Sequence, residues 1–424
     1  MAYVVYVDHY NHKAIVHDEE CTAHRRRGVR KVREDHWRTG FETAAEAMRF
    51  ARSTGERRVD YCSWCLAEEK KKPARRGRSR TGFKVAIIGT GKPRSMQGRT
   101  GFAMAYSHAD GYRATTGCEL VACVDIAEEN ARAFADRYGL RRVYADYREM
   151  LATEKPDIVS ICTWPHLHHP MVLDCARAGV RAIHCEKPMA PTFGEAKEMV
   201  RVCQETRTQL TFNHQRRFEN RFVMARNLVR EGVIGELRRM EGHWGNMMDV
   251  GTHWLDLFNF YNDDTPAEWV LAQVHRHNDA SAFGVQVENQ ALCYIAYKNG
   301  VYGLLAMGEG HTIWAEHRLW GTEGVIEVDY PVVRVRGKGD GDWRVLEAAN
   351  PEGPDASITK GIQDLVECLR TRREPVLSAR NAFAATEIIF ATYESCRRRG
   401  RVDLPLTIDD NPLHDLIKRG LLNR

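Results

Sequence analysis

The sequence contains no uninterrupted apolar segment of the roughly 18 to 20 residues that a membrane-spanning helix requires. Its first residues, MAYVVYVDHYNHK, lack the basic start and apolar run of a secretory signal. The 62 basic and 57 acidic residues leave a net charge of +5, too small a bias to favour nucleic acid or an anionic membrane as the main partner. We therefore expect a cytoplasmic protein that acts on a small polar molecule.

Internal repeats are also absent, and the twelve cysteines do not form the dense pattern of a small disulfide-bonded domain. Most cysteines lie within apolar segments, among them residues 121–125, 159–164 and 291–297. We expect these thiols to be reduced and buried. With 424 residues, 43% of them hydrophobic, the chain has enough apolar material for two or three cores.

A charged segment, KKKPARRGRSR at residues 70–80, separates two parts of the chain that both have the composition of folded protein. It contains proline and glycine and has no apolar periodicity. A patch that binds nucleic acid or another anion is one interpretation. A solvated linker over residues 70–82 explains the segment better, because no aromatic residues are interleaved with the basic ones.

Beyond this linker, short β-branched runs at residues 84–88, 119–124, 157–162 and 180–186 alternate with helical stretches. Parallel strands need crossover connections, which are usually helices, so this alternation predicts a parallel sheet with helices on both faces.

After about residue 208 the strands become longer and hairpin signals appear. The clearest hairpin spans residues 288–308, where the dipeptide Asn299-Gly300 predicts a type I′ turn. Residues 317–330 predict a second hairpin. Helical patterns near 358–372 and 381–399 end the chain. This part should be an α+β domain with a large, mostly antiparallel sheet.

A dinucleotide site is predicted where the first strand runs into Gly89, Thr90 and Gly91, since glycines there let the backbone turn sharply and approach a pyrophosphate. The third glycine is not at its usual spacing, and Gly98 or Gly101 takes its place in a longer loop. Asp125 ends the second strand, where its carboxylate can accept hydrogen bonds from a ribose. Ile126 follows it, with no arginine for a 2′-phosphate, which favours NAD over NADP.

These motifs predict a doubly wound Rossmann domain at residues 83–207, followed by the α+β domain at 208–424. Its closing helices are expected to pack back on the Rossmann domain. Residues 1–69 form a small N-terminal α/β module.

Several ordered motifs between residues 83 and 407 resemble the glucose-fructose oxidoreductase, inositol dehydrogenase and rhizopine catabolism (Gfo/Idh/MocA) family. They are KVAIIGTG, VACVD, CTWPHLHHPMV, HCEKPMA, NHQRRF, GVIGELRRMEGHWG, DVGTHWLDL, LWGTEGVIEV and RVDLPL. The resemblance implies a Rossmann domain, a second domain whose open sheet mediates homo-oligomer contacts, and an active site between the two.

The resemblance also implies roles for individual residues. The nicotinamide ribose would be lined by a loop that contains Thr163, Trp164, Pro165 and His169. In Glu186-Lys187-Pro188 the lysine would point at the reacting hydroxyl, and Asp249 and His253 match the family's Asp-x-x-x-His pair. The chain departs from common members in its long glycine loop, its N-terminal extension and the presence of Trp164.

These residue types suit the oxidation of an alcohol. A histidine with a pKa near 6.5 can accept the hydroxyl proton, so His253 is the expected base. Asp249, four residues earlier, would share its helix face and bind substrate or orient the base. Lys187 would stabilise the developing alkoxide. Arg217 and His243 are further candidates for binding substrate, although a structural role suits each of them as well.

The N-terminal module contains the residue types of a structural zinc site. The expected ligands are His17, Cys21, Cys62 and Cys65, with His24 as an alternative to His17. A metal would stabilise a module too small for a large core. The Cys-x-x-Cys pair could instead be redox-active or simply reduced.

The leading hypothesis is an NAD-dependent oxidoreductase that acts on a hydroxyl of a sugar, cyclitol or glycoside. One alternative is elimination or glycoside cleavage in which NAD is only transiently reduced. Another is an NAD-binding regulator without catalysis, against which the presence of Lys187, Asp249 and His253 argues.

Overall fold

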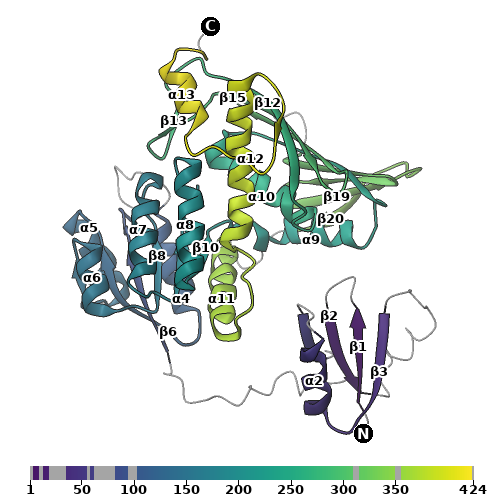
Figure 1. Ribbon diagram of the computed structural model, residues 1–424, viewed down its shortest axis with the longest axis horizontal. Helices are drawn as coiled ribbons and strands as arrows, with labels where there is room; N and C mark the ends of the chain where they lie inside the picture. Colours follow the sequence, from purple (N-terminus) through teal and green to yellow (C-terminus); the bar gives the residue numbers. More distant parts are fainter. Residues whose placement is uncertain are drawn as a thin grey trace. The chain divides into compact units, whose positions relative to one another are not determined.

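The computed structural model describes residues 3–8, 13–18, 35–54, 58–61, 82–93, 103–308, 315–348 and 355–422. The chain divides into two compact units, Met1–Arg80 and Thr81–Arg424 (Figure 1). Within the part of the chain that the structure describes, no helix combines the length and apolar character needed to cross a membrane. The described cysteines are free thiols, and all but Cys118 and Cys162 are buried.

The first unit is a four-stranded sheet with one helix. Its elements are β1 (Tyr3–Asp8), β2 (Lys13–Asp18), β3 (Asp35–Phe41), α2 (Ala44–Ser53) and β4 (Arg58–Tyr61), with strand order β3-β1-β2-β4. Alternate residues of β1 and β2, such as Val5 and Val16, form the core with Ala47 and Ala51 of α2.

The expected zinc ligands cannot be placed within this unit. Cys21, Cys62, Cys65 and the alternative ligand His24 lie outside the described residues, as does the side chain of His17.

The second unit begins with a six-stranded parallel sheet. Its strands are β5 (Phe83–Ile88), β6 (Cys118–Val124), β7 (Val143–Tyr144), β8 (Ile158–Ile161), β9 (Ala182–Cys185) and β10 (Gln209–Phe212). The order β10-β9-β8-β5-β6-β7 reverses between β5 and β8, as in a doubly wound Rossmann sheet. Its helices are α4 (Met104–Arg113), α5 (Glu128–Tyr138), α6 (Tyr147–Glu154), α7 (Pro165–Arg177) and α8 (Phe193–Thr206).

Both faces of this sheet are covered because successive side chains of a strand point to opposite faces. In β5, Ala86 and Ile88 pack with α6, α7 and α8, whereas Val85 and Ile87 pack with α4 and α5. Helix α11 (Ala356–Thr371), from the far end of the chain, completes the second of these cores with Ile362 among its residues.

The remainder of the second unit is built on a nine-stranded sheet with strand order β20-β19-β18-β17-β11-β16-β15-β12-β21. The strands are β11 (Leu237–His243), β12 (Ala267–His275), β15 (Gln290–Tyr297), β16 (Tyr302–Gly308), β17 (His317–Gly321), β18 (Gly324–Val328), β19 (Val332–Gly337), β20 (Arg344–Glu347) and β21 (Val402–Asp403). Neighbours pair antiparallel, except that β11 and β16 are parallel.

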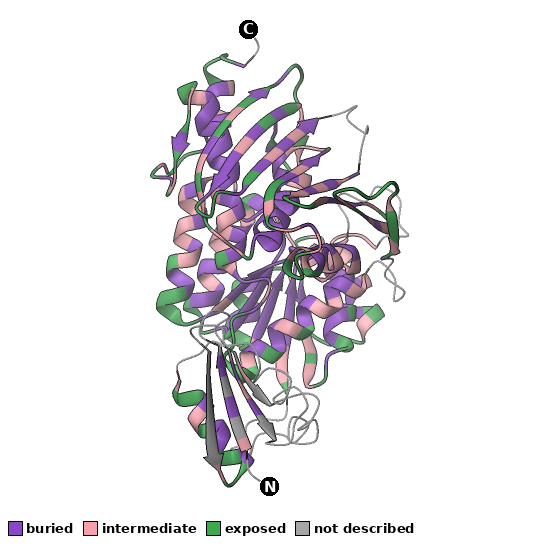
Figure 2. Cartoon of the chain, turned by 90° about the vertical axis from the view of Figure 1, so that its right-hand side faces the viewer, coloured by how far each residue is buried: buried purple, intermediate pink, exposed green. Residues whose placement is uncertain are grey.

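Helices cover one face of this sheet, and Figure 2 shows buried and exposed residues alternating along its strands. The helices of this part are α9 (Asn220–Arg230), α10 (Thr252–Tyr261), α12 (Ala379–Arg398) and α13 (Pro412–Lys418). The uncovered face exposes Leu271, Leu292 and Tyr302. The α/β class predicted from the sequence is confirmed, with a parallel Rossmann sheet followed by a large, mostly antiparallel one.

The hairpin of β15 and β16 was expected to have a type I′ turn, and this detail is wrong. A type I′ turn needs positive φ at both central residues, but of the Asn299-Gly300 dipeptide only Gly300 has one, at +79°. Ala296 pairs with Tyr302 in the register, which leaves a longer loop than the two-residue turn of type I′. A turn that ends on a left-handed glycine suits that length.

Candidate active site

A cavity of about 1230 Å³ lies in the second unit and is lined by residues of both its sheets. Its volume exceeds the roughly 300–1,000 Å³ of an ordinary ligand pocket, so it has room for a dinucleotide together with a small substrate. Most of the expected site residues line it, namely Gly89, Thr90, Gly91, Asp125, Ile126, Thr163, Trp164, Pro165, Glu186, Lys187, Asp249 and His253.

The glycine turn after β5 is held by Asp125. The Asp125 Oδ2 atom accepts hydrogen bonds from the Gly91 N–H at 2.9 Å and the Thr90 hydroxyl at 3.0 Å. Gly89 has φ +84°, and a Cβ atom there would lie 2.6 Å from Thr163 Cγ2. Glycine is therefore required at position 89 by both backbone conformation and space. Gly98 and Gly101 lie outside the described residues.

Asp125 retains capacity for a ligand. Its Oδ1 atom accepts one hydrogen bond, from the Ala127 N–H at 2.9 Å, and a carboxylate oxygen can accept about two. Asn130 also lines the cavity, although no sequence motif pointed to it. Ile126 is 95% exposed.

The loop at the start of α7 brings Thr163, Trp164 and Pro165 to the cavity, but His169 does not line it. The His169 Nε2 atom lies 2.9 Å from Glu198 Oε2 on α8. The neighbouring His168 is buried instead, with its ring nitrogens 3.0 Å from the Pro188 carbonyl and 3.1 Å from the Thr163 carbonyl. His168 thus connects two cavity loops, a role that the sequence did not indicate.

Glu186 lines the cavity with a buried, ionised carboxylate. Its Oε1 atom lies 2.9 Å from His108 Nε2 and accepts a hydrogen bond from Asn213 Nδ2 at 2.8 Å. Burial alone would raise the pKa of Glu186, but the contacts with His108 and Asn213 and the nearby Lys187 lower it to about 2. The backbone before Lys187 is fixed by this network, and the Lys187-Pro188 bond is cis.

Lys187 and Asp249 form an ion pair at the cavity wall, with Lys187 Nζ 2.5 Å from Asp249 Oδ1. The two side chains are 11% and 29% exposed. Asp249 lies in a π-helical turn, Met247–Gly251, that leads directly into α10, where His253 lies. The expectation of one continuous α-helix is therefore wrong in detail, yet both side chains reach the same cavity.

His253 is buried and neutral. Burial, then the charges of Lys187, Arg216 and His214, keep its pKa well below 6.5. Its Nδ1 atom has no hydrogen-bond partner among the described residues. A neutral imidazole beside a lysine can accept a proton that is released by a hydroxyl group.

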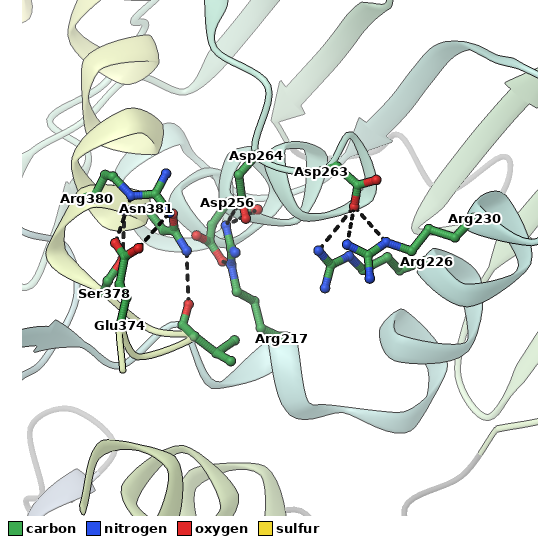
Figure 3. Close-up of polar contacts among 11 residues, drawn as sticks. Arg217, Arg226, Arg230, Asp256, Asp263, Asp264, Glu374, Ser378, Arg380 and Asn381 are labelled. Carbon is green, nitrogen blue, oxygen red and sulfur yellow. Dashed lines mark hydrogen bonds and ion pairs between the residues drawn. The ribbon is translucent and has the colours of Figure 1, made fainter. Parts of the chain in front are cut away.

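Arg217, in the short helix Gln215–Phe218, does not line the cavity, because its side chain is buried in ion pairs with Asp256 and Asp264 (Figure 3). Its Nε atom donates to Asp256 Oδ2 at 2.8 Å, and its Nη2 atom donates to Asp264 Oδ1 at 2.8 Å. The preceding residue, Arg216, lines the cavity, with its guanidinium 4.7 Å from the centre of the Trp254 ring. Burial lowers the pKa of Arg216.

His243 is also placed away from the cavity. It is buried at the end of β11, and its Nε2 atom lies 3.0 Å from the Ala315 carbonyl. The next residue, Trp244, lines the cavity.

The chain is similar in sequence and in fold to known oxidoreductases. Residues 83–214 match a family model, GFO_IDH_MocA, described as an oxidoreductase family with an NAD-binding Rossmann fold. This match supports the resemblance to the Gfo/Idh/MocA family that the sequence motifs indicate.

Particular relatives extend beyond that segment. D-apiose dehydrogenase of Paraburkholderia graminis is 26% identical over 382 residues, which cover 81% of this chain and 95% of the relative. D-glucoside 3-dehydrogenase of Escherichia coli is 30% identical over 195 residues, covering 41% and 52%. A levoglucosan dehydrogenase structure in complex with NADH has a similar fold, with a TM-score of 0.67 and 19% identity over 77% of this chain and all of that one.

Proposed function

We propose that the chain is an NAD-dependent oxidoreductase that transfers hydride between nicotinamide and a hydroxyl-bearing carbon of a sugar, cyclitol or glycoside. One observation carries the proposal: a single cavity is lined by the Asp125-bound glycine turn, by the Lys187–Asp249 pair and by His253. The sugar dehydrogenases among the relatives support this substrate class.

The residues fit the cofactor. Gly91 has open space where a Cβ atom would lie, and Asp125 and the Thr163–Pro165 loop line the same cavity, which supports their role in binding ribose hydroxyls. Bound NAD supplies the hydride acceptor for the alcohol carbon. None of the described cavity residues next to Asp125 in the sequence is basic, so none of them can bind the 2′-phosphate of NADP. This supports a preference for NAD over NADP.

The protein's part in the reaction is to handle the proton and the oxygen. His253 accepts the hydroxyl proton, and the Lys187 ammonium stabilises the alkoxide as the C–H bond breaks and its electron pair leaves carbon. Asp249 holds Lys187 in position. In the reverse direction the same groups return the proton to the carbonyl oxygen.

The test is NADH formation from NAD and a panel of sugars, sugar acids and inositols, followed by substitution of the base. His253→Ala should lower kcat by about 10²-fold or more and leave NAD affinity nearly unchanged. His275→Ala, an exposed histidine of β12 that does not line the cavity, serves as control. If His253→Ala turns over substrate at the wild-type rate, His253 is not the catalytic base.

Product analysis tests the two alternatives in the same experiment. Conversion of substrate without net NADH would indicate elimination or cleavage, and a relative from Mediterraneibacter gnavus, 25% identical over 234 residues, is a 2,7-anhydro-N-acetylneuraminate hydratase. NAD binding without turnover of any substrate would indicate a regulator.

A further inference from the structure

A small hairpin, separate from both large sheets, reaches the cavity beside Lys187. It consists of β13 (Ser281–Ala282) and β14 (Val285–Gln286), joined by Phe283 and Gly284. Both turn residues have positive φ, +51° and +75°, as a type I′ turn requires. A bulky side chain such as Phe283 rarely adopts this conformation, so the surrounding structure must hold it there.

The base of the hairpin is fixed to the second domain. Val285 and Val287 are buried in its core. Asn289 accepts a hydrogen bond from the His277 N–H at 2.9 Å and donates one to Asn278 Oδ1 at 2.8 Å. The tip is therefore held in place by a packed and hydrogen-bonded base.

At the tip, two aromatic rings from different parts of the unit meet at the cavity. The Phe283 ring centre lies 4.8 Å from Lys187 Nζ and 6.4 Å from the ring centre of Trp164, with the two ring planes at 60°. The backbone of Gly284 is also close to Trp164, because a Cβ atom on Gly284 would lie 3.5 Å from that ring. Trp164 remains 38% exposed, and both aromatic residues line the cavity.

This position has a chemical consequence. If Lys187 holds the reacting hydroxyl, the carbon skeleton of the substrate lies next to the Phe283 ring. A saturated six-membered ring with mostly equatorial hydroxyls has an apolar face of axial C–H groups, which suits the electron-rich face of an aromatic ring. An open-chain polyol presents no such continuous face.

We propose that Phe283 and Trp164 are specificity-determining residues that form an aromatic platform for the C–H face of a cyclic polyol, so that ring-form substrates are preferred to open-chain ones. This proposal rests on the proposed function, since it takes Lys187 as the site of the reacting hydroxyl. It narrows the proposed substrate class to polyols in ring form, that is, pyranosides and cyclitols.

The experiment compares Phe283→Ala, Phe283→Leu and Phe283→Tyr with wild type on methyl glycosides and myo-inositol as ring substrates and on sorbitol as an open-chain one. Phe283→Leu is the matched control, because it keeps apolar volume but removes the aromatic face. Turnover is measured with NAD, and affinity for the same polyols is measured by calorimetry in the presence of NADH.

For ring substrates we expect KM to rise about tenfold in Phe283→Ala and also to rise in Phe283→Leu, with Phe283→Tyr close to wild type. Trp164→Ala should also raise the KM for ring substrates about tenfold. In the Phe283 variants, NAD affinity and the KM for sorbitol should not change. The proposal would be wrong if KM rose equally for ring and open-chain substrates or if only kcat fell. It would also be wrong if Phe283→Leu kept the wild-type KM for ring substrates.

The calorimetric arm separates this proposal from the dehydrogenase proposal. If ring polyols bind about tenfold more weakly to Phe283→Ala but wild type never forms NADH, the platform stands and the proposed reaction fails. If wild type oxidises only open-chain alcohols, or does not bind ring polyols, the platform fails.

Discussion

The protonation of His253 decides at which pH the proposed reaction can run. Burial, Lys187, Arg216 and His214 keep its pKa well below 6.5, so the imidazole stays neutral and able to accept a proton on the acid side of neutrality. We expect kcat/KM to hold its plateau down to below about pH 6.5. Arg216→Gln removes one of the charges that lower this pKa, so the acid-side loss of activity should move to higher pH.

The measurement is the pH profile of kcat/KM for wild type, Arg216→Gln and a control, Arg226→Gln. Arg226 is an arginine of α9 that does not line the cavity and pairs with Asp263. Superimposable profiles for wild type and Arg216→Gln would contradict the assignment of His253 as the base.

Asp125 should determine the choice between NAD and NADP. Its carboxylate would repel a 2′-phosphate, so Asp125→Ala should reduce the ratio of NAD to NADP affinity by about tenfold or more. NAD binding should also weaken, because the glycine turn loses the two hydrogen bonds that Thr90 and Gly91 donate to Asp125. Thr90→Val removes only the hydroxyl bond and keeps the charge, so selectivity should persist. An Asp125→Ala variant with undiminished selectivity for NAD would show that another group is responsible.

Sequence motifs located the cavity-lining segments but did not determine which of two adjacent residues faces the cavity. The sequence favoured Arg217, His169 and His243, whereas the structure brings Arg216 and Trp244 to the cavity and uses His168 between two of its loops. Neighbours in a helix point about 100° apart, and neighbours in a strand point to opposite faces. Which of them turns inward depends on packing partners such as Asp256, which lie far along the chain.

Among the elements, the π-helical turn that carries Asp249 depends on a buried carboxyl group, Glu288. Glu288 Oε1 accepts the Met247 N–H at 2.6 Å, and Glu288 Oε2 accepts the Tyr393 hydroxyl of α12 at 2.7 Å. Burial raises the pKa of Glu288 to about 7. The folded protein therefore keeps a proton on Glu288 between about pH 4.5 and 7, where the unfolded chain has lost it.

This difference predicts how stability depends on pH. Because the folded state binds the extra proton, the contribution of Glu288 to the free energy of unfolding falls as pH rises through this window, by up to about 1.4 kcal/mol per pH unit, and levels off above pH 7. Glu288→Gln should remove that part of the slope in urea unfolding, whereas Glu347→Gln, an exposed residue of β20, should not. An unchanged slope in Glu288→Gln would show that Glu288 titrates normally.

The type of a hairpin turn depends on strand register as well as on the dipeptide at the turn. Asn299-Gly300 has the type I′ signature but forms a longer loop, while Phe283-Gly284, which lacks that signature, has positive φ at both positions. Strand register sets loop length, and loop length selects the turn. Register depends on the core face of each strand, which a dipeptide does not encode.

For the molecule as a whole, the open face of the nine-stranded sheet is expected to mediate self-association. Leu271 and Leu292 are 47% and 55% exposed there, and Tyr294 and Tyr302 stack with ring centres 5.3 Å apart. An exposed apolar surface of this kind is typical of an interface. Leu292→Asp should convert an oligomer to monomers in analytical ultracentrifugation, and Leu421→Asp, outside the sheet, should not. A wild-type chain that is monomeric at micromolar concentration would contradict this.

Zinc in the N-terminal unit stays a prediction. Metal analysis of the purified full chain should give about one zinc per chain if His17, Cys21, Cys62 and Cys65 bind it, and Cys62→Ser should lose the metal. A zinc content far below one per chain would show that these residues do not form a zinc site.

The position of α11 has a consequence for how the chain is made. Ile362 of α11 packs in one core with Val85 and Ile87 of β5. It also packs closely against Gly111 of α4, because a Cβ atom on Gly111 would lie only 2.7 Å from Ile362 Cδ1. The ribosome therefore finishes β5 long before it synthesises the helix that covers it. Until then α4 and α5 alone cover this face of the Rossmann sheet, and the apolar surface that α11 will bury stays in contact with water. Transiently exposed apolar surface of this kind favours aggregation, so we expect the nascent chain to be most prone to aggregate before α11 is made.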